Sequence, residues 1–373
     1  MTIFIVLALI IPLGFISQWT KIPSLIYYLL AGIILGPYGL KIINFNQEPL
    51  IRSVALVTIM LRSGLGLSLK SLKEVGKPAV LMSFIPGVLE ATSISIVAML
   101  LFDFSLIQSF ILGFMLAAVS PAVVVPAMLN LQDKNLGGNL PTMILASSAV
   151  DDVVALSFFT FFTSLYFNQA GSLLISLLLI PVKMGFSFIV GYFLVYLMKN
   201  LKKYNIILVV LVAIIVKRFE ADLPITALIL IMSMGISLSK HAPASAKILS
   251  KWTKHFWKLA SIFLFVSVGA QLNILALKEV YILGLILIII GLIFRSLGVM
   301  FSVSSLSKKE QLFSVFAFLP KATVQAALAG VPLSMGIVGG DIMLLLAVLS
   351  IVFTTPIGAS LISIMAPKLL DQG

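Results

Sequence analysis

The sequence predicts an all-α polytopic membrane protein with about thirteen transmembrane helices, and three observations lead to this fold class. Of the 373 residues, 61% are hydrophobic and only 10% are charged, whereas soluble proteins carry about 25% charged residues. The apolar residues form long runs along the whole chain, and a membrane-spanning helix needs about 20 such residues. Basic residues gather in the short stretches between these runs, so the net charge of +12 indicates membrane orientation and not nucleic-acid binding.

Thirteen apolar runs are counted as spans. The first begins at Met1 without a basic region or a cleavage site, so we expect a retained helix and not a signal peptide. The eighth and ninth runs are separated only by residues 220–222. The approximate cores are 2–17, 22–40, 50–69, 79–102, 105–131, 140–167, 171–198, 204–219, 223–239, 257–275, 280–304, 311–335 and 342–366. The longest polar stretch, Lys240 to Lys258, is interpreted as a basic connector at the cytoplasmic interface.

The distribution of lysine and arginine tests this count. Sixteen of the 25 basic residues lie in the odd-numbered loops and the C-terminal tail, and five lie in the even-numbered loops. Because cytoplasmic loops carry the excess of Lys and Arg, the N-terminus is predicted outside and the C-terminus in the cytoplasm, in the cell membrane. A single miscounted span would have removed this asymmetry, so it supports an odd number near thirteen. The five basic residues of the even-numbered loops are Lys41, Arg52, Lys217, Arg218 and Lys278.

Two spans are interrupted by prolines. The fifth contains Pro121 and Pro126 in AAVSPAVVVPAML, and the twelfth contains Pro320, Lys321 and Thr323 in FLPKATVQAALAGVP. A proline removes a helical hydrogen bond and strains the preceding turn. One such span is usually only a packing kink, but these two are each the fifth span of a half of the chain.

An inverted repeat follows from that correspondence. The halves are residues 1–168 and 204–366, joined by a linker helix at 171–198, and the offset of seven spans inverts one half relative to the other. Interrupted helices at corresponding positions of inverted halves indicate a transporter binding site near the bilayer midplane. Helix ends and unwound backbone there supply partial charges for ions.

Three carboxylates lie deep inside spans, Glu90, Asp151 and Asp152. A charge at the bilayer centre costs about 2.5 to 3.5 kcal/mol, so each needs a partner or a function. Ser148 lies four residues before Asp152, on the same helix face, and adds a hard oxygen ligand suited to an alkali cation. Thiolate ligands are excluded because the chain has no cysteine. The alternative to ion binding, for each aspartate, is a structural hydrogen bond to backbone groups that an interrupted helix leaves free.

Two basic residues also lie inside spans. Arg295 and Glu90 occupy corresponding spans of the two halves, which favours a buried ion pair that positions helices, with proton coupling as the rival interpretation. Lys321, directly after Pro320, is predicted to offset carbonyl ends and to compensate the nearby aspartate charge.

Several of these segments resemble a known family, the monovalent cation/proton antiporters of the second branch, and specifically its NHA subgroup of sodium/proton antiporters. The resemblance covers nearly the whole chain. The matching segments are LRSGLGL (61–67), VLEA (88–91), AAVSPAVVVPAMLNLQ (117–132), ASSAVDDVVAL (146–156), FLFVSVGAQL (263–272) and FLPKATVQAAL (318–328).

The resemblance implies an NhaA-like fold with two crossed discontinuous helices. It also implies a core transport domain built from about 79–167 and 280–335, a dimerisation domain built from the remaining helices, a homodimer and elevator-like alternating access. Asp152 would be the principal ion-binding and proton-accepting carboxylate, with Asp151 as its partner. Ser120 begins the first discontinuous stretch. Many electrogenic relatives have lysine at the position of Arg295. Because arginine is effectively never deprotonated, a mechanism in which that lysine carries a proton cannot run unchanged here.

The expected function is sodium (or lithium)/proton antiport across the bilayer, in which cations and protons compete for the aspartates. Potassium/proton exchange is the rival transport function, because oxygen ligands alone do not fix ion size. A cation channel is disfavoured by the inverted interrupted helices. An intramembrane aspartyl protease needs two aspartates on separate helices, whereas Asp151 and Asp152 are neighbours. We expect no enzymatic activity, no cofactor and no nucleic-acid partner.

Overall fold

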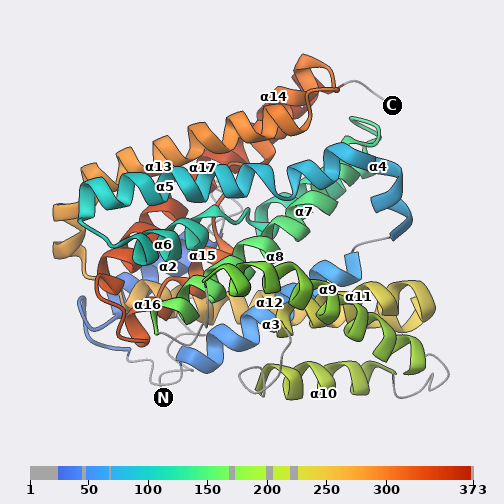
Figure 1. Cartoon of the computed structure of the whole chain (residues 1–373), viewed down its shortest axis with the longest axis horizontal. Helices are drawn as coiled ribbons and strands as arrows, with labels where there is room; N and C mark the ends of the chain where they lie inside the picture. Colours follow the sequence, from blue (N-terminus) through green and yellow to red (C-terminus); the bar gives the residue numbers. More distant parts are fainter. Residues whose placement is uncertain are drawn as a thin grey trace.

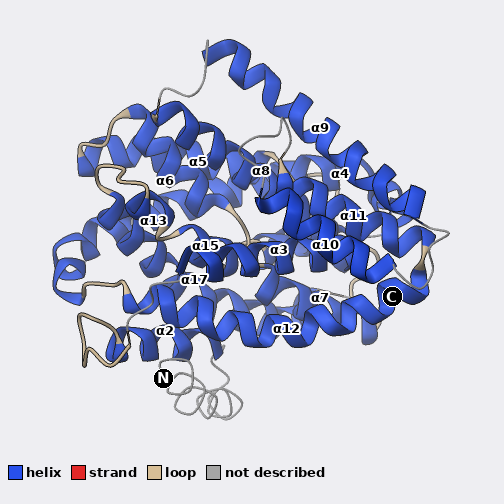
Figure 2. Ribbon diagram, turned by 90° about the horizontal axis from the view of Figure 1, so that it is seen from below, coloured by secondary structure: helices blue, strands red, loops and turns tan. Residues whose placement is uncertain are grey.

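The computed structural model describes residues 24–43, 48–66, 69–167, 173–198, 205–218 and 226–370. Every regular element in these ranges is a helix (Figure 2). They account for twelve of the thirteen predicted spans, and the first, 2–17, lies outside the described residues. Five described helices are long and apolar enough to cross a membrane, and six shorter ones are also apolar. The predicted all-α membrane class is therefore confirmed.

One group of helices forms a scaffold, in which α11 packs between α3 and α9 while α12 packs on α2 and α3. Small residues allow close backbone approach between membrane helices, and at the α2–α12 contact a Cβ on Gly269 would lie 2.1 Å from the carbonyl oxygen of Leu29. The scaffold comprises α2 (Ser24–Leu35), α3 (Glu48–Gly66), α9 (Leu173–Met198), α10 (Asn205–Arg218), α11 (Ala227–His241) and α12 (Pro243–Ala270).

A second group surrounds the interrupted spans. Within it α5 runs beside α13 along one edge of the molecule, and α10 of the scaffold lies at the opposite edge (Figure 1). The group comprises α4 (Leu69–Met82), α5 (Ile85–Phe102), α6 (Leu106–Ala117), α7 (Pro121–Asp133), α8 (Leu140–Tyr166), α13 (Ile274–Ser302), α14 (Lys308–Ala317), α15 (Thr323–Leu328), α16 (Val331–Ser334) and α17 (Gly340–Leu369).

The fifth predicted span is α6 followed by α7, and its break covers residues 118–120. The break therefore ends at Ser120, immediately before Pro121. Pro121 occupies the first turn of α7, where a missing N–H costs no hydrogen bond, and Pro126 lies inside α7.

The twelfth span is divided between α14 and α15 by an unwound stretch at 318–322 that contains Pro320. Both interrupted spans start with the same local signal. A capping box at Ser105 begins α6 and another at Ser307 begins α14, so each is anchored at its outer end by two reciprocal hydrogen bonds.

Two boundaries differ from the sequence prediction. The fourth span is divided into α4 and α5, and α4 bends at Gly76, whose φ of +61° is easily adopted only by glycine. The supposed connector from Lys240 to Lys258 is helical, since α12 begins at Pro243 and continues without interruption to Ala270.

Candidate functional site

The two interrupted spans cross at their breaks. The backbone amide of Ser120, in the first break, donates to the carbonyl oxygen of Pro320, in the second, over 2.9 Å. The side-chain amide of Gln325 donates to the carbonyls of Leu116 and Ala118 over 3.1 Å and 2.6 Å. These bonds satisfy backbone groups that the breaks release, which is the condition for irregular backbone at membrane depth.

Helix α17 holds the second break from the other side. The amide of Lys321 donates to Oγ1 of Thr354 over 2.9 Å, and Oγ1 of Thr355 donates to the Lys321 carbonyl over 2.5 Å. Both threonines are buried. The backbone of Lys321 is thus fixed on both sides, and this directs its side chain toward the first break.

Arg295, on α13, is the centre of a buried charge network. Its Nη1 lies 2.5 Å from Oε2 of Glu90, and its Nη2 lies 2.8 Å from Oδ2 of Asp151. The same guanidinium also donates to the carbonyls of Phe318 and Ala117, one in each crossing span. A buried arginine needs such saturation of its donors, since an unpaired buried charge is costly.

Lys321 shares Glu90 with the arginine, because its Nζ lies 2.6 Å from Oε2 of Glu90. The Nζ also donates to the carbonyl of Ala117 over 3.1 Å. Two cations therefore lie at the C-terminal end of α6, where the helix dipole favours positive charge. The structure places Lys321 on a carbonyl end as the sequence suggested, but its ion-pair partner is Glu90 and not an aspartate.

The neighbouring aspartates of α8 have different surroundings. Oδ2 of Asp151 accepts the Arg295 bond and also the backbone amide of Val119 over 3.0 Å. The contact with Val119 is the hydrogen bond to broken backbone that the sequence left as an alternative for each aspartate. Helix α5 presses against this carboxylate, and a Cβ on Gly87 would lie 2.8 Å from Oδ1 of Asp151.

Asp152 is fully buried, at 0% exposure, yet neither of its carboxylate oxygens has a hydrogen-bond partner among the described residues. Among the described residues, three further buried oxygens in the crossing spans also have no hydrogen-bond partner. They are Oγ of Ser120, Oγ1 of Thr323 and Oε1 of Gln325. Buried oxygens in native proteins are normally hydrogen-bonded. Unpartnered buried oxygens on Asp152 and on three residues of the crossing spans therefore point to a bound species that oxygen ligands suit.

The other predicted site residues serve the backbone. Oγ of Ser148 donates to the carbonyl of Leu145 over 3.1 Å, which leaves its lone pairs available. Pro121 is buried at the start of α7, and Pro126 is exposed one turn further along.

Sequence reasoning missed three contributors. The polar Gln325 of the twelfth span and the pair Thr354 and Thr355 were not singled out as site residues. Sequence reasoning also did not anticipate the contact between Arg295 and Asp151. The available signal was the polar type of these side chains inside otherwise apolar helices, since such residues need partners in a membrane.

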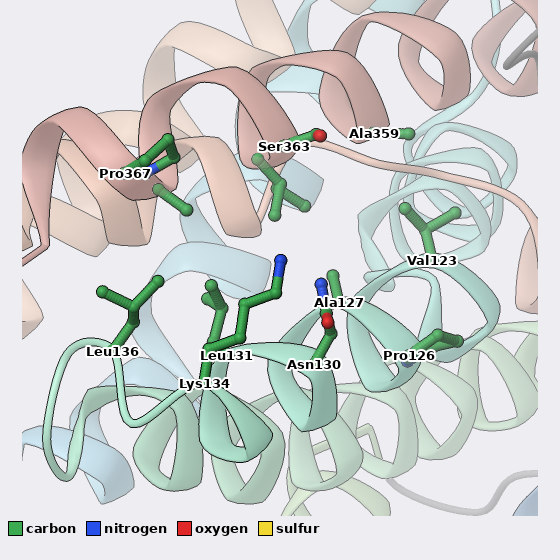
Figure 3. A pocket seen from close by; sticks show the side chains of 12 residues that line it. Val123, Pro126, Ala127, Asn130, Leu131, Lys134, Leu136, Ala359, Ser363 and Pro367 are labelled. Carbon is green, nitrogen blue, oxygen red and sulfur yellow. The ribbon is translucent and has the colours of Figure 1, made fainter.

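A cavity of about 430 Å³ lies between α7 and α17. Figure 3 shows the amine of Lys134 directed into the space between the two helices. Asp152 is not among its lining residues, so this cavity is separate from the crossing. It is lined by Val123, Pro126, Ala127, Asn130, Leu131, Lys134, Leu136, Ala359, Ile362, Ser363, Ala366 and Pro367.

Comparison with known proteins identifies the family. The chain is similar to Sodium/hydrogen exchanger 9B2 of Xenopus tropicalis (31% identity, 88% of this chain and 65% of the relative) and of Homo sapiens (30% identity, 94% and 70%). The chain thus spans about two thirds of the length of these relatives. Its fold matches the structure of the sodium proton antiporter MjNhaP1 from Methanocaldococcus jannaschii at pH 8, with a TM-score of 0.84 and 21% identity. The match covers 98% of this chain and 97% of that chain.

The family named "Sodium/hydrogen exchanger, transmembrane" matches residues 5–368, nearly the whole chain. This match confirms the membership that the sequence motifs predicted, within a family of transporters. The chain therefore belongs to the sodium/hydrogen exchanger family.

Proposed function

We propose that the chain exchanges sodium or lithium for protons across the membrane, and that both ions bind the carboxylate of Asp152. The observation that carries this proposal is the contrast between the two aspartates. Asp151 is held by Arg295 and by the amide of Val119, whereas Asp152 is buried without a partner among the described residues. A carboxylate in this position gains most from binding either a cation or a proton.

The other ligands would come from the crossing spans. Oγ of Ser120, Oγ1 of Thr323 and Oε1 of Gln325 are hard neutral oxygens without partners in the described part of the molecule. Such ligands suit alkali cations and not soft transition metals. A single free carboxylate with neutral oxygens also favours a monovalent ion, which one negative charge neutralises.

In this proposal Asp151 is a positioning residue. Its carboxylate links α8 to Arg295 and to the first break, and so fixes the helix that carries Asp152. Arg295 stays charged throughout, because arginine is effectively never deprotonated in proteins. Proton coupling is therefore assigned to Asp152, which would release a proton when it binds the cation.

Alternating access would move the second helix group against the scaffold. The proposed core of 79–167 and 280–335 corresponds to α4 to α8 and α13 to α16. We extend it to α17, which contacts α14, α13, α16 and α7. The cation-loaded or protonated core is neutral at Asp152 and would cross, whereas the bare site would not. The working unit is proposed as a homodimer in the cell membrane, with its N-terminus outside and its C-terminus in the cytoplasm.

Proteoliposome exchange tests the assignment. Asp152→Asn should abolish sodium-driven proton movement at nearly constant side-chain volume. Asp103→Asn is the matched control, since Asp103 is exposed, caps α5 with a φ of +52°, and asparagine tolerates that conformation. Sodium-dependent proton movement that persists in Asp152→Asn would contradict the proposal.

The same vesicles separate the rival functions. Sodium, lithium and potassium are compared with the membrane voltage clamped. A response to potassium alone would favour potassium/proton exchange, and cation flux that moves no protons in exchange would indicate a channel. The names of the relatives refer to sodium, and sodium is therefore the cation expected to give the largest response.

A further inference from the structure

Helix α12 has three distinct faces along residues 246–260. One face is buried against the protein and is occupied by Ala246, Leu249, Thr253, Trp257 and Ala260. At about 100° per residue these positions fall within an arc of about 80°. The rest of the helix surface in this stretch faces away from the protein.

A second face is apolar although it is exposed. Ile248, Trp252, Phe256 and Leu259 are 52%, 73%, 49% and 43% exposed, and they follow each other at intervals of three or four residues. They form a stripe of large apolar side chains that the protein leaves uncovered. In a family of membrane transporters such a stripe is suited to the acyl chains of lipids.

The third face is basic. Lys247, Lys251, Lys254 and Lys258 are all exposed and fall within an arc of about 60° at the helical repeat. The sequence contains no carboxylate between residues 223 and 278, so neither α12 nor the segments flanking it supply a counter-charge. The four charges form a line beside the apolar stripe and are not scattered through a loop.

We propose that this basic stripe of α12 binds the headgroups of anionic phospholipids in the cytoplasmic leaflet, while Trp252 and its apolar neighbours contact the acyl chains. Basic residues next to a membrane-embedded helix segment attract anionic lipids. The helix has 28 residues, or about 42 Å, and so exceeds the roughly 30 Å hydrocarbon core. The excess places its N-terminal part at headgroup level.

The direction of the side chains supports the same occupant. Helical side chains tilt toward the N-terminus of their own helix, which for α12 is the predicted cytoplasmic end. Lysines nearer the membrane can therefore extend their amines toward the headgroups while their stems remain in apolar surroundings. An acidic protein or a nucleic acid would match the charges, but it would leave the adjacent apolar stripe without a partner.

Tryptophan fluorescence provides the test, because Trp252 lies on the proposed contact. The purified full chain in detergent is titrated with phosphatidylglycerol or phosphatidylcholine carrying brominated acyl chains, which quench nearby tryptophans. Wild type should be quenched at a lower mole fraction of phosphatidylglycerol than of phosphatidylcholine, and added salt should reduce the difference. Equal quenching by the two lipids, or a preference that salt leaves unchanged, would overturn the proposal.

Matched charge variants locate the site. The triple substitution Lys251→Gln, Lys254→Gln, Lys258→Gln should weaken the apparent affinity for phosphatidylglycerol about a hundredfold, at about fivefold per lysine. The control Lys308→Gln, Lys309→Gln, Lys368→Gln removes the same charge from exposed positions on the same predicted side and should keep the preference. Equal losses in both triples would show a nonspecific charge effect and overturn the assignment.

A charge-preserving variant guards against misfolding. Arginine at positions 251, 254 and 258 keeps the positive stripe, so this variant should retain the preference for phosphatidylglycerol even if the glutamine triple does not fold. Loss of the preference in the folded arginine variant would contradict an electrostatic headgroup contact. Trp252→Phe should remove most of the quenching and would thereby confirm the reporter.

Discussion

Asp151 and Asp152 are adjacent in the sequence and equally buried, but their surroundings predict opposite effects on stability. Asp151→Asn removes the negative charge that pairs with Arg295, and breaking a buried pair costs about 3 to 5 kcal/mol. Asp152→Asn removes an unpartnered buried charge, so thermal stability should stay the same or rise. Melting temperatures in sodium-free buffer test this, and the prediction fails if the two variants lose stability equally.

A double-mutant cycle tests the contact between Glu90 and Arg295. Glu90→Gln and Arg295→Gln should each lower stability by about 3 to 5 kcal/mol, because each leaves an uncompensated buried charge. The double variant should recover part of the loss, since the two losses share one interaction. The exposed Lys309→Gln serves as the control and should be neutral. Strictly additive losses would show that the two residues do not interact in the folded protein.

At this scale the sequence identified the charged residues but not all of their partners. The cost of burying a charge singles out Glu90, Asp151, Asp152, Arg295 and Lys321 without any structure. Which carboxylate meets which cation depends on how α5, α8 and α13 meet the two breaks. That is a tertiary property, and it explains why Lys321 was expected beside an aspartate and lies beside Glu90.

Gln325 links the two interrupted spans at the scale of elements, and Gln311 offers a matched comparison. Each side-chain amide donates to two backbone carbonyls, Gln325 across the crossing and Gln311 at the start of α14. Removing the Gln325 donor leaves two buried carbonyls unsatisfied, at about 1 to 3 kcal/mol each, whereas the part-buried carbonyls that Gln311 holds can turn to water and should cost less. Both alanine variants should therefore melt at lower temperature.

Of the two, only Gln325→Ala should also weaken the apparent sodium affinity, because it removes the proposed ligand oxygen Oε1 as well as the contacts with the first break. Exchange measured against sodium concentration, with folded protein quantified in the same vesicles, separates the two effects. If Gln311→Ala weakened sodium affinity to the same extent, Gln325 would have no special role in cation binding.

Prolines predicted which spans are interrupted, but they did not fix the position of each break. A proline fits the first turn of a helix, so Pro121 indicates the start of α7 as readily as a kink in its middle. The capping boxes at Ser105 and Ser307 are local signals in the sequence, and they mark the outer ends of both interrupted spans. The breaks themselves are held by distant groups such as Thr354 and Gln325, which local patterns do not reveal.

At the scale of the whole molecule, hydropathy and the lysine distribution were sufficient to predict the fold class, because a bilayer admits few solutions for an apolar chain. Which helices pack against each other was harder to predict. Helix α17, which the resemblance implied among the dimerisation helices, packs on α14 and α13. Nothing in its own sequence distinguishes an apolar helix that contacts one group from an apolar helix that contacts the other.

The proposed exchange cycle makes a prediction about pH. If one carboxylate serves both ions, a bound proton excludes the cation, so sodium and protons compete at Asp152. Apparent sodium affinity should then improve as pH rises, by up to about tenfold per unit while the site is mostly protonated, and should level off once it is deprotonated.

Transport is measured against sodium at several pH values with both ion gradients and the voltage controlled. The maximal rate at saturating sodium should change much less than the apparent affinity, because saturating cation displaces the proton. Asp103→Asn should follow the wild-type curve, since that carboxylate is exposed and lies outside the crossing. An apparent sodium affinity that stays constant over about two pH units around the onset of activity would exclude competition at a shared site. It would instead place the proton and the cation on separate groups, and the buried pair of Lys321 and Glu90 would become the next candidate for the proton.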